Sequence, residues 1–367
     1  MLGSRRRSTL GALLCVNLMA VVGLVAMSEG VSAAAKCKKA GQVRGTRVCT
    51  KVGKDLVWVA APVATTTTTT LAPKGGGSGG AGGSSATTTT VAKSYASLTI
   101  GTKYSYTAAA VGQPFYCKAL SGAGETKYGD WISGSVWYPA RKPYWPSTTK
   151  ITTGSFSAVV SGSNRILAGN GLPIGLGATV GNYPFNSSNE LYSKYDPNSG
   201  SLSAYTISKT VPATPTANAS PTCLPGGMLG ITNTGVAFYG ANDAVMRDAA
   251  AYEILDSCGG HPVKATGSYH YHSLFLAEYG RAYGNVWSCI DLGSAGAHGN
   301  LIGYANDGFG IYGPYGATGA LLSTADLDEC HGDTHSITWD GATVSLYHYH
   351  ATADYPYTLS CFRGTPK

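Results

Sequence analysis

Long hydrophobic runs are almost absent from the sequence. The longest one lies at residues 10–27, where glycine and asparagine residues interrupt it, and about 18 residues is the lower limit for a helix that spans a bilayer. Three arginines at positions 5–7 precede this run, and small residues follow it at positions 31–35. This arrangement is typical of a cleaved export signal. We therefore expect a secreted or cell-surface protein with no stable membrane span after cleavage.

Acidic residues are scarce at positions 36–222, where 18 Lys and Arg stand against 5 Asp and Glu, a formal net charge of +13. Residues 223–367 reverse the balance, with 5 against 13 and a net charge of −8. A basic segment suits an anionic cell-wall polymer and an acidic one suits a cation, although solvated surfaces also carry such charges. Nucleic acid is not an expected partner, because binding it needs a folded basic groove and the chain is expected to be exported.

Free cysteine is not expected in the mature chain. Cys15 lies in the export signal, which leaves eight cysteines. An even number in an exported chain predicts four disulfides and argues against cysteine as a nucleophile or metal ligand. Cys37 and Cys49 are expected to pair locally. The other six allow fifteen connectivities, and they are Cys117, Cys223, Cys258, Cys289, Cys330 and Cys361.

Composition divides the chain into four parts. Residues 1–35 are the export signal. Residues 36–60 form a small basic module with a disulfide, which resembles a Cys/Lys-rich unit of actinobacterial exported proteins and suggests attachment to a cell-wall polymer. Residues 61–94 are rich in Thr, Gly and Ser and have no apolar periodicity, as in a flexible linker. Residues 95–367 form the main domain, with the histidine-rich part at residues 223–367.

The main domain is expected to be all-β, a sandwich or a distorted barrel stabilised by disulfides. Short alternating runs rich in Tyr, Val, Thr and Trp are separated by turn residues. We expect strands at residues 98–106, 135–138, 156–160, 202–207 and 343–350. Only residues 243–255 indicate a helix. No repeat of 20–50 residues is visible, which argues against a propeller or a solenoid.

Histidine is absent before position 261, and all eight histidines fall between His261 and His350. Four of them form two identical Tyr-His-Tyr-His tetrapeptides, at residues 269–272 and 347–350. Because side chains alternate along a strand, both histidines of each motif point to one face and both tyrosines to the other. If the two strands pair or face each other, four imidazoles converge.

Such a convergence predicts a divalent metal ion held by His270, His272, His348 and His350. With the thiols in disulfides, imidazole and carboxylate ligands favour zinc or copper, with calcium as an alternative. Asp307 is the candidate catalytic base, and nearby carboxylates are candidates to orient the rings. The alternative without an ion is a hydrogen-bonded ladder in the core. Secondary candidates are His261, Asp307, Asp328, Glu329 and His331, with Asp326 and Asp333 as further acids and His298 as a loop histidine.

The two tetrapeptides and several other segments resemble the YHYH domain family. These segments are Gly260-His261-Pro262, the glycine-rich residues 303–314, Leu327-Asp328-Glu329-Cys330 and Cys361-Phe362-Arg363-Gly364. The resemblance covers residues 131–365 and implies an exported protein, but it implies no particular reaction. His331 stands where the family pattern suggests a small polar residue, so we do not expect it in the central site.

Three functions fit these residues. The first is an exported protein that binds a divalent metal through its clustered histidines. The second is an enzyme, either a metal-dependent hydrolase, in which three histidines hold the ion and the fourth or Asp307 acts as general base, or a copper redox enzyme. The third is a non-catalytic protein of the cell envelope or matrix. An open coordination position distinguishes the second from the first.

Overall fold

The computed structural model describes residues 43–44, 47–52, 55–60, 97–121, 128–145, 147–174, 179–181, 195, 201–256, 258–274 and 290–367. The chain divides into two units, Met1–Ser85 and Ala86–Lys367. In the first unit an antiparallel sheet contains β1 (Val43–Arg44), β2 (Arg47–Val52) and β3 (Asp55–Ala60). Cys37, the expected disulfide partner of Cys49, lies outside the described residues.

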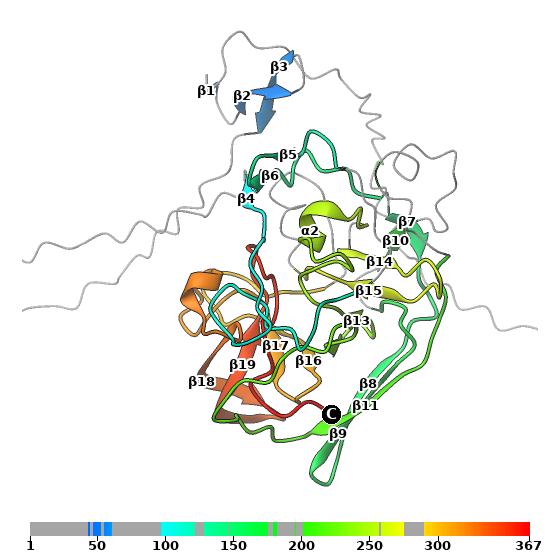
Figure 1. Ribbon diagram of the computed structural model, residues 1–367, viewed down its shortest axis with the longest axis vertical. Coiled ribbons are helices and arrows are strands. Elements are labelled where there is room, and N and C mark those ends of the chain that lie inside the picture. Colours follow the sequence, from blue (N-terminus) through cyan, green and yellow to red (C-terminus); the bar gives the residue numbers. More distant parts are fainter. Residues whose placement is uncertain are drawn as a thin grey trace, which may run out of the picture. The chain divides into compact units, whose positions relative to one another are not determined.

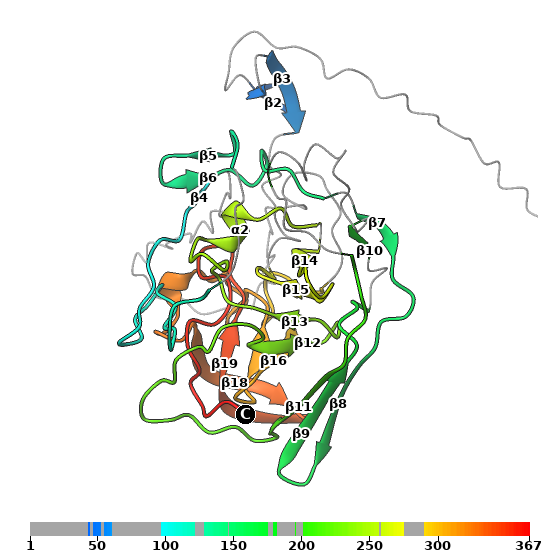
Figure 2. The same ribbon diagram turned by 45° about the vertical axis from the view of Figure 1, so that its right-hand side comes forward.

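A mixed sheet of eight strands forms the centre of the second unit (Figures 1 and 2). Its neighbouring strands are antiparallel except for the pairs β13/β15 and β17/β19, which are parallel. The strands, in their order across the sheet, are β14 (Gly260–Pro262), β15 (Tyr269–Tyr271), β13 (Ala237–Phe238), β12 (Gly230–Thr232), β16 (Leu301–Ala305), β17 (Gly310–Tyr312), β19 (Ala342–His350) and β18 (Gly332–Trp339).

Three smaller sheets accompany it. The largest is the antiparallel sheet β11–β9–β8, which forms the long ribbon in Figure 2. The others are β4–β6–β5 and β10–β7. Their strands are β4 (Leu98–Thr99), β5 (Ile132–Ser133), β6 (Val136–Trp137), β7 (Ser147–Lys150), β8 (Phe156–Ser161), β9 (Asn164–Gly169), β10 (Thr179–Gly181) and β11 (Ile207–Pro212).

Both faces of the central sheet are packed. One face carries buried Tyr269, Tyr271, Tyr347 and Tyr349 in the larger hydrophobic cluster. In the smaller cluster, Ile231 and Tyr304 of the central sheet pack with Leu167 of β9 and Val211 of β11. The all-β prediction is confirmed, and the central sheet is open, with β14 and β18 at its two edges.

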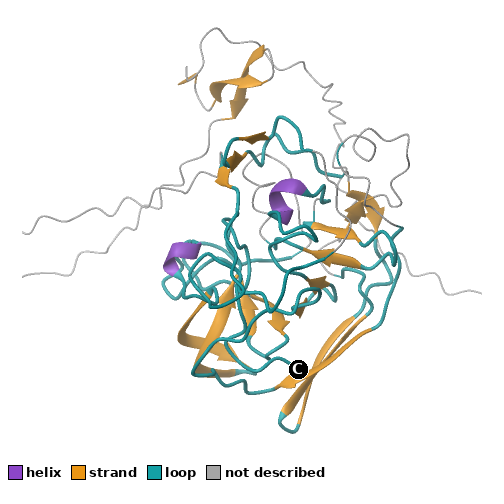
Figure 3. Cartoon of the chain, viewed as in Figure 1, coloured by secondary structure: helices purple, strands orange, loops and turns teal. Residues whose placement is uncertain are grey.

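Helix in the described residues is limited to α2 (Ala249–Tyr252) and the single 3-10 turn η1 (Thr324–Asp326) (Figure 3). The helix expected at residues 243–255 is therefore too long. The Asp243 carboxylate accepts hydrogen bonds from the backbone N–H groups of Val245 and Arg247, and Met246 has a φ of 67°. These turn contacts compete with helix, and α2 begins only after Asp248, whose side chain caps it.

Two expected strands also differ from the structure. The one expected at residues 98–106 ends after two residues as β4, and the one expected at residues 202–207 begins only at Ile207 as β11. At the far end of the first of these ranges the chain turns, because the Ser105 hydroxyl accepts from the backbone N–H groups of Thr107 and Ala108.

Disulfides stabilise the fold, as predicted. Cys117 pairs with Cys223, and Cys330 pairs with Cys361. Cys258 is disulfide-bonded as well, and Cys289 lies outside the described residues. The Cys330–Cys361 bond ties the turn before β18 to the C-terminal segment. No helix in the described part of the chain is both long and apolar enough to cross a bilayer.

Two candidate metal centres

The two YHYH motifs lie in the same sheet but do not meet. Four strands, β13, β12, β16 and β17, separate β15 from β19. At about 4.8 Å between neighbouring strands, the motifs are roughly 24 Å apart. The expected convergence of four YHYH histidines on one site is therefore not found. Each motif instead gathers other histidines around it, which gives two separate clusters.

The first His cluster consists of His261, His270 and His272 with Glu253. His261 comes from β14, His270 from β15, His272 from the end of that strand, and Glu253 from the residue after α2. The Nε2 atoms of His270 and His272 are 3.1 Å apart. Glu253 Oε2 lies 3.0 Å from His261 Nε2 and 3.1 Å from His272 Nε2. All four side chains are buried.

Backbone carbonyl groups set the tautomers of the YHYH histidines in this cluster. His272 Nδ1 lies 2.8 Å from the Gly240 carbonyl oxygen, and His270 Nδ1 lies 3.2 Å from that of Ser268. A carbonyl only accepts, so each Nδ1 carries the hydrogen and each Nε2 presents a lone pair. Tyr239 stacks on His270 with ring centroids 4.0 Å apart and fixes the orientation of that ring.

The second His cluster consists of His298, His335, His348 and His350 with Asp333. Its donors come from the loop before β16 and from the edge pair β18 and β19. Asp333 Oδ1 lies 3.4 Å from the Nε2 atoms of His335, His348 and His350. The Nε2 atoms of His298 and His348 are 3.2 Å apart. His348 and His350 are fully buried.

The second cluster has the same tautomer arrangement. His350 Nδ1 lies 2.7 Å from the carbonyl oxygen of Gly313, and His348 Nδ1 lies 2.9 Å from that of Leu346. The two Nδ1 atoms therefore donate, and both Nε2 lone pairs point into the cluster. His350 Nε2 and Asp333 Oδ1 are buried and have no hydrogen-bond partner in the described part of the chain.

Burial disfavours the charged form of four imidazoles in the two clusters, those of His270, His272, His298 and His348. It lowers the pKa of His348 to about 3 and that of His298 to about 4. It also lowers the pKa of His270 and of His272. At neutral pH a proton shared between two facing ring nitrogen atoms is therefore unfavourable. Their lone pairs are available to a cation.

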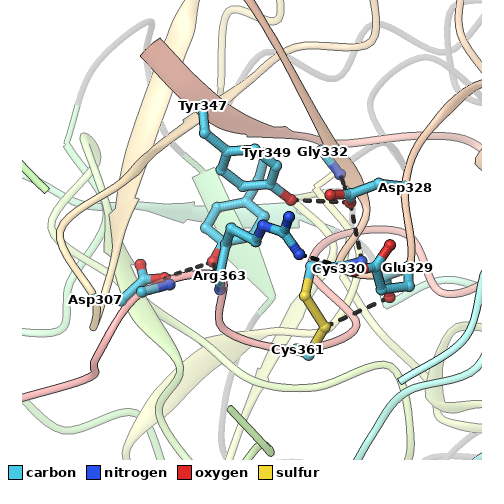
Figure 4. Close-up of a disulfide and its surroundings, with 10 residues drawn as sticks. Asp307, Asp328, Glu329, Cys330, Gly332, Tyr347, Tyr349, Cys361 and Arg363 are labelled. Atoms are coloured by element: carbon cyan, nitrogen blue, oxygen red, sulfur yellow. Dashed lines mark hydrogen bonds and ion pairs between the residues drawn. A yellow bond between two sulfur atoms is a disulfide. The ribbon is translucent and has the colours of Figure 1, made fainter. Parts of the chain in front are cut away.

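The tyrosines of the second motif point toward two carboxylates, Asp307 and Asp328 (Figure 4). Tyr349 Oη donates to Asp307 Oδ2 at 2.6 Å, and Tyr347 Oη donates to Asp328 Oδ1 at 2.9 Å. Asp307 also accepts from the backbone N–H groups of Phe309 and Gly364, and its burial raises its pKa. Asp307 and Asp328, the candidate ring-orienting carboxylates, thus lie on the tyrosine face of β19.

The remaining secondary candidates have other partners. Glu329 accepts a 2.8 Å hydrogen bond from Arg363 beside the Cys330–Cys361 disulfide (Figure 4). His331 Nδ1 donates to the His350 carbonyl oxygen at 2.9 Å, and its Nε2 lies 3.1 Å from the Thr324 hydroxyl. His331 therefore contacts the backbone of the second motif and does not belong to the second His cluster.

Five donors were not among the four main candidates drawn from the sequence: Glu253, His261, His298, Asp333 and His335. Strand periodicity could have indicated Asp333 and His335, because they alternate along β18 directly beside β19. Glu253 and His298 carry no such signal, since each comes from a non-strand segment distant from its motif.

Comparison with known protein families gives a match over part of the chain. Residues 208–321 match the model of the family described as YHYH protein. This region contains β12, β13 and the first YHYH motif and extends through β17. No curated protein and no solved structure matches the chain. Over residues 208–321 the chain is therefore similar to the YHYH protein family.

Proposed function

We propose that this protein binds divalent transition-metal ions, one at each His cluster. The supporting observation is the set of facing lone pairs. His270 and His272 turn two bare Nε2 atoms toward each other at 3.1 Å, and both Nδ1 hydrogens are engaged by carbonyl groups. Two lone pairs at that distance repel each other unless a cation lies between them.

The spacing of the donors fits a metal ion. Ligands at about 2.0–2.1 Å from a tetrahedral zinc ion lie roughly 3.3 Å from one another. The donor contacts span 3.0–3.1 Å in the first cluster and 3.2–3.4 Å in the second. Imidazole nitrogen with one carboxylate oxygen favours zinc or copper, whereas calcium prefers oxygen ligands throughout.

Elemental analysis of the secreted, oxidised protein tests this proposal. We expect about two zinc or copper ions per chain. A variant with His270, His272, His348 and His350 all replaced by Ala is expected to retain none, and circular dichroism checks that it is folded. A metal-free parent protein would contradict the proposal, as would an unchanged metal content in the variant.

We also propose that the protein is exported and attached to an anionic cell-wall polymer through its basic module. Intramolecular disulfides support export, because they persist in oxidising compartments. The excess of Lys and Arg in residues 36–60 supports the polymer as partner. Deleting these residues is expected to abolish salt-sensitive sedimentation of the protein with purified cell walls. Equal sedimentation of the truncated and full-length chains would contradict this role.

A further inference from the structure

The central sheet has an internal two-fold pattern. The middle pair is β12 and β16. From this pair to either edge of the sheet, successive neighbouring strands pair antiparallel, then parallel, then antiparallel. The middle pair is itself antiparallel, with Ile231 opposite Tyr304. In this pattern β12, β13, β14 and β15 correspond in turn to β16, β17, β18 and β19.

The amino-acid sequence repeats in the same register. Residues 230–240 read GITNTGVAFYG and residues 303–313 read GYANDGFGIYG. The Asn233 and Asn306 amides make matching hydrogen bonds to the Leu301 and Met228 carbonyls, at 3.0 and 2.7 Å. The turn glycines that follow, at positions 235 and 308, both have a positive φ.

The second part of each copy also corresponds. Tyr269 donates to Asp256 at 2.8 Å, as Tyr347 donates to Asp328 at 2.9 Å. The last histidine of each motif contacts an equivalent glycine carbonyl, since His272 lies 2.8 Å from Gly240 and His350 lies 2.7 Å from Gly313. Gly260 lies opposite Tyr271 as Gly332 lies opposite Tyr349. Residues 230–272 and 303–350 are therefore two copies of one structural unit.

The two clusters occupy equivalent places but differ in their donors. The residue opposite the first YHYH histidine is His261 in the first copy and Asp333 in the second. Glu253 supplies the carboxylate of the first cluster, so that cluster offers three imidazoles and one carboxylate. The second cluster offers four imidazoles and one carboxylate, because His298 and His335 join it.

The clusters also differ in access to solvent. In the first, the side chains of His261, His272 and Glu253 are only 5, 5 and 11% exposed, and His270 is buried. In the second, the side chains of Asp333 and His335 are 33% and 16% exposed. A closed four-donor set is typical of structural sites, whereas exposed ligands let water and competing ligands reach the ion.

From these differences we infer that the duplicated unit carries two centres with separate roles. The first His cluster, with Glu253 as its fourth ligand, holds a structural ion, and the second His cluster holds an ion that exchanges with the surroundings. This inference rests on the proposed function. The two ions are then not equivalent, and Glu253 and Asp333 each supply the carboxylate ligand of one centre.

Release of zinc to an excess of a coloured chelator tests it. For the zinc-loaded full-length protein we expect one ion to leave quickly and the other about 100-fold more slowly, because release from a buried site waits for local opening of the fold. Glu253→Gln is expected to accelerate the slow phase by about 10- to 100-fold and to leave the fast phase unchanged. Asp333→Asn, the matched control, is expected to alter the fast phase alone. Replacing His348 and His350 by Ala removes the fast phase.

The outcomes separate the inference from the proposed function. Release of two ions in a single phase would overturn the division of roles while metal binding itself stands. Slow release that responds to Asp333→Asn and not to Glu253→Gln would overturn the assignment of the two centres. A wild-type protein that retains no zinc after loading would contradict the proposed function and this inference together.

Discussion

Removing the metal ions is expected to lower the free energy of unfolding by about 5 kcal/mol. At free metal concentrations of about 100 times Kd, an ion that binds only the folded chain stabilises it by about 2.7 kcal/mol per site. The donors of each cluster come from separate segments. An ion in the first His cluster would link β14 and β15 to Glu253 after α2, and one in the second would link the loop with His298 to β18 and β19. Unfolding separates these residues, so it would release the bound ions.

Urea denaturation with and without a strong chelator measures this effect. The variant with His270, His272, His348 and His350 replaced by Ala is the control, and the chelator is expected to leave its midpoint unchanged. A wild-type midpoint that the chelator does not move would contradict the prediction. In that case the histidines would form the hydrogen-bonded ladder that is the alternative to a metal site.

Replacing Asp307 by Ala is expected to destabilise the protein by about 3–5 kcal/mol. The buried carboxylate accepts from Tyr349 Oη and from the backbone N–H groups of Phe309 and Gly364. Its removal leaves these donors without an acceptor in a dry interior, and each such donor costs about 1–3 kcal/mol. Chemical denaturation of the metal-loaded protein measures the loss.

The internal repeat supplies a matched control for Asp307. Thr234 occupies the equivalent position in the first copy, where its hydroxyl lies 3.2 Å from Tyr271 Oη. Thr234→Val is expected to cost only about 1 kcal/mol, because neutral hydroxyl contacts to Tyr271 and Thr232 are lost instead of a carboxylate. Both variants are expected to keep their metal content in the folded state. An Asp307→Ala protein of normal stability that no longer binds metal would contradict the structural role and return Asp307 to the metal site.

Local patterns in the sequence predicted a large part of this structure. Alternation along the second YHYH motif places Tyr347 and Tyr349 on one face and His348 and His350 on the other, as the structure has them. The strand expected at residues 343–350 is β19, which begins one residue earlier. These predictions succeed because side-chain alternation is a property of a single strand.

Long-range arrangement was the part that local patterns could not supply. Whether β15 and β19 meet depends on the strand order, and four other strands lie between them. The same applies to the carboxylates. Asp307 looked suitable because it follows a strand in a tight turn, but its hydrogen bonds place it with Tyr349. Glu253 had no local signal, since its contact with His261 depends on how α2 packs beside β14.

Anomalous diffraction at the zinc absorption edge, on crystals of the zinc-loaded protein, tests the central claim most directly. The account predicts two anomalous peaks. One is expected about 2.0–2.1 Å from the Nε2 atoms of the first His cluster, and the other at the same distance from the Nε2 atoms of His348 and His350. Crystals that show no peak at either cluster, with the histidine Nε2 atoms hydrogen-bonded to water, would contradict it.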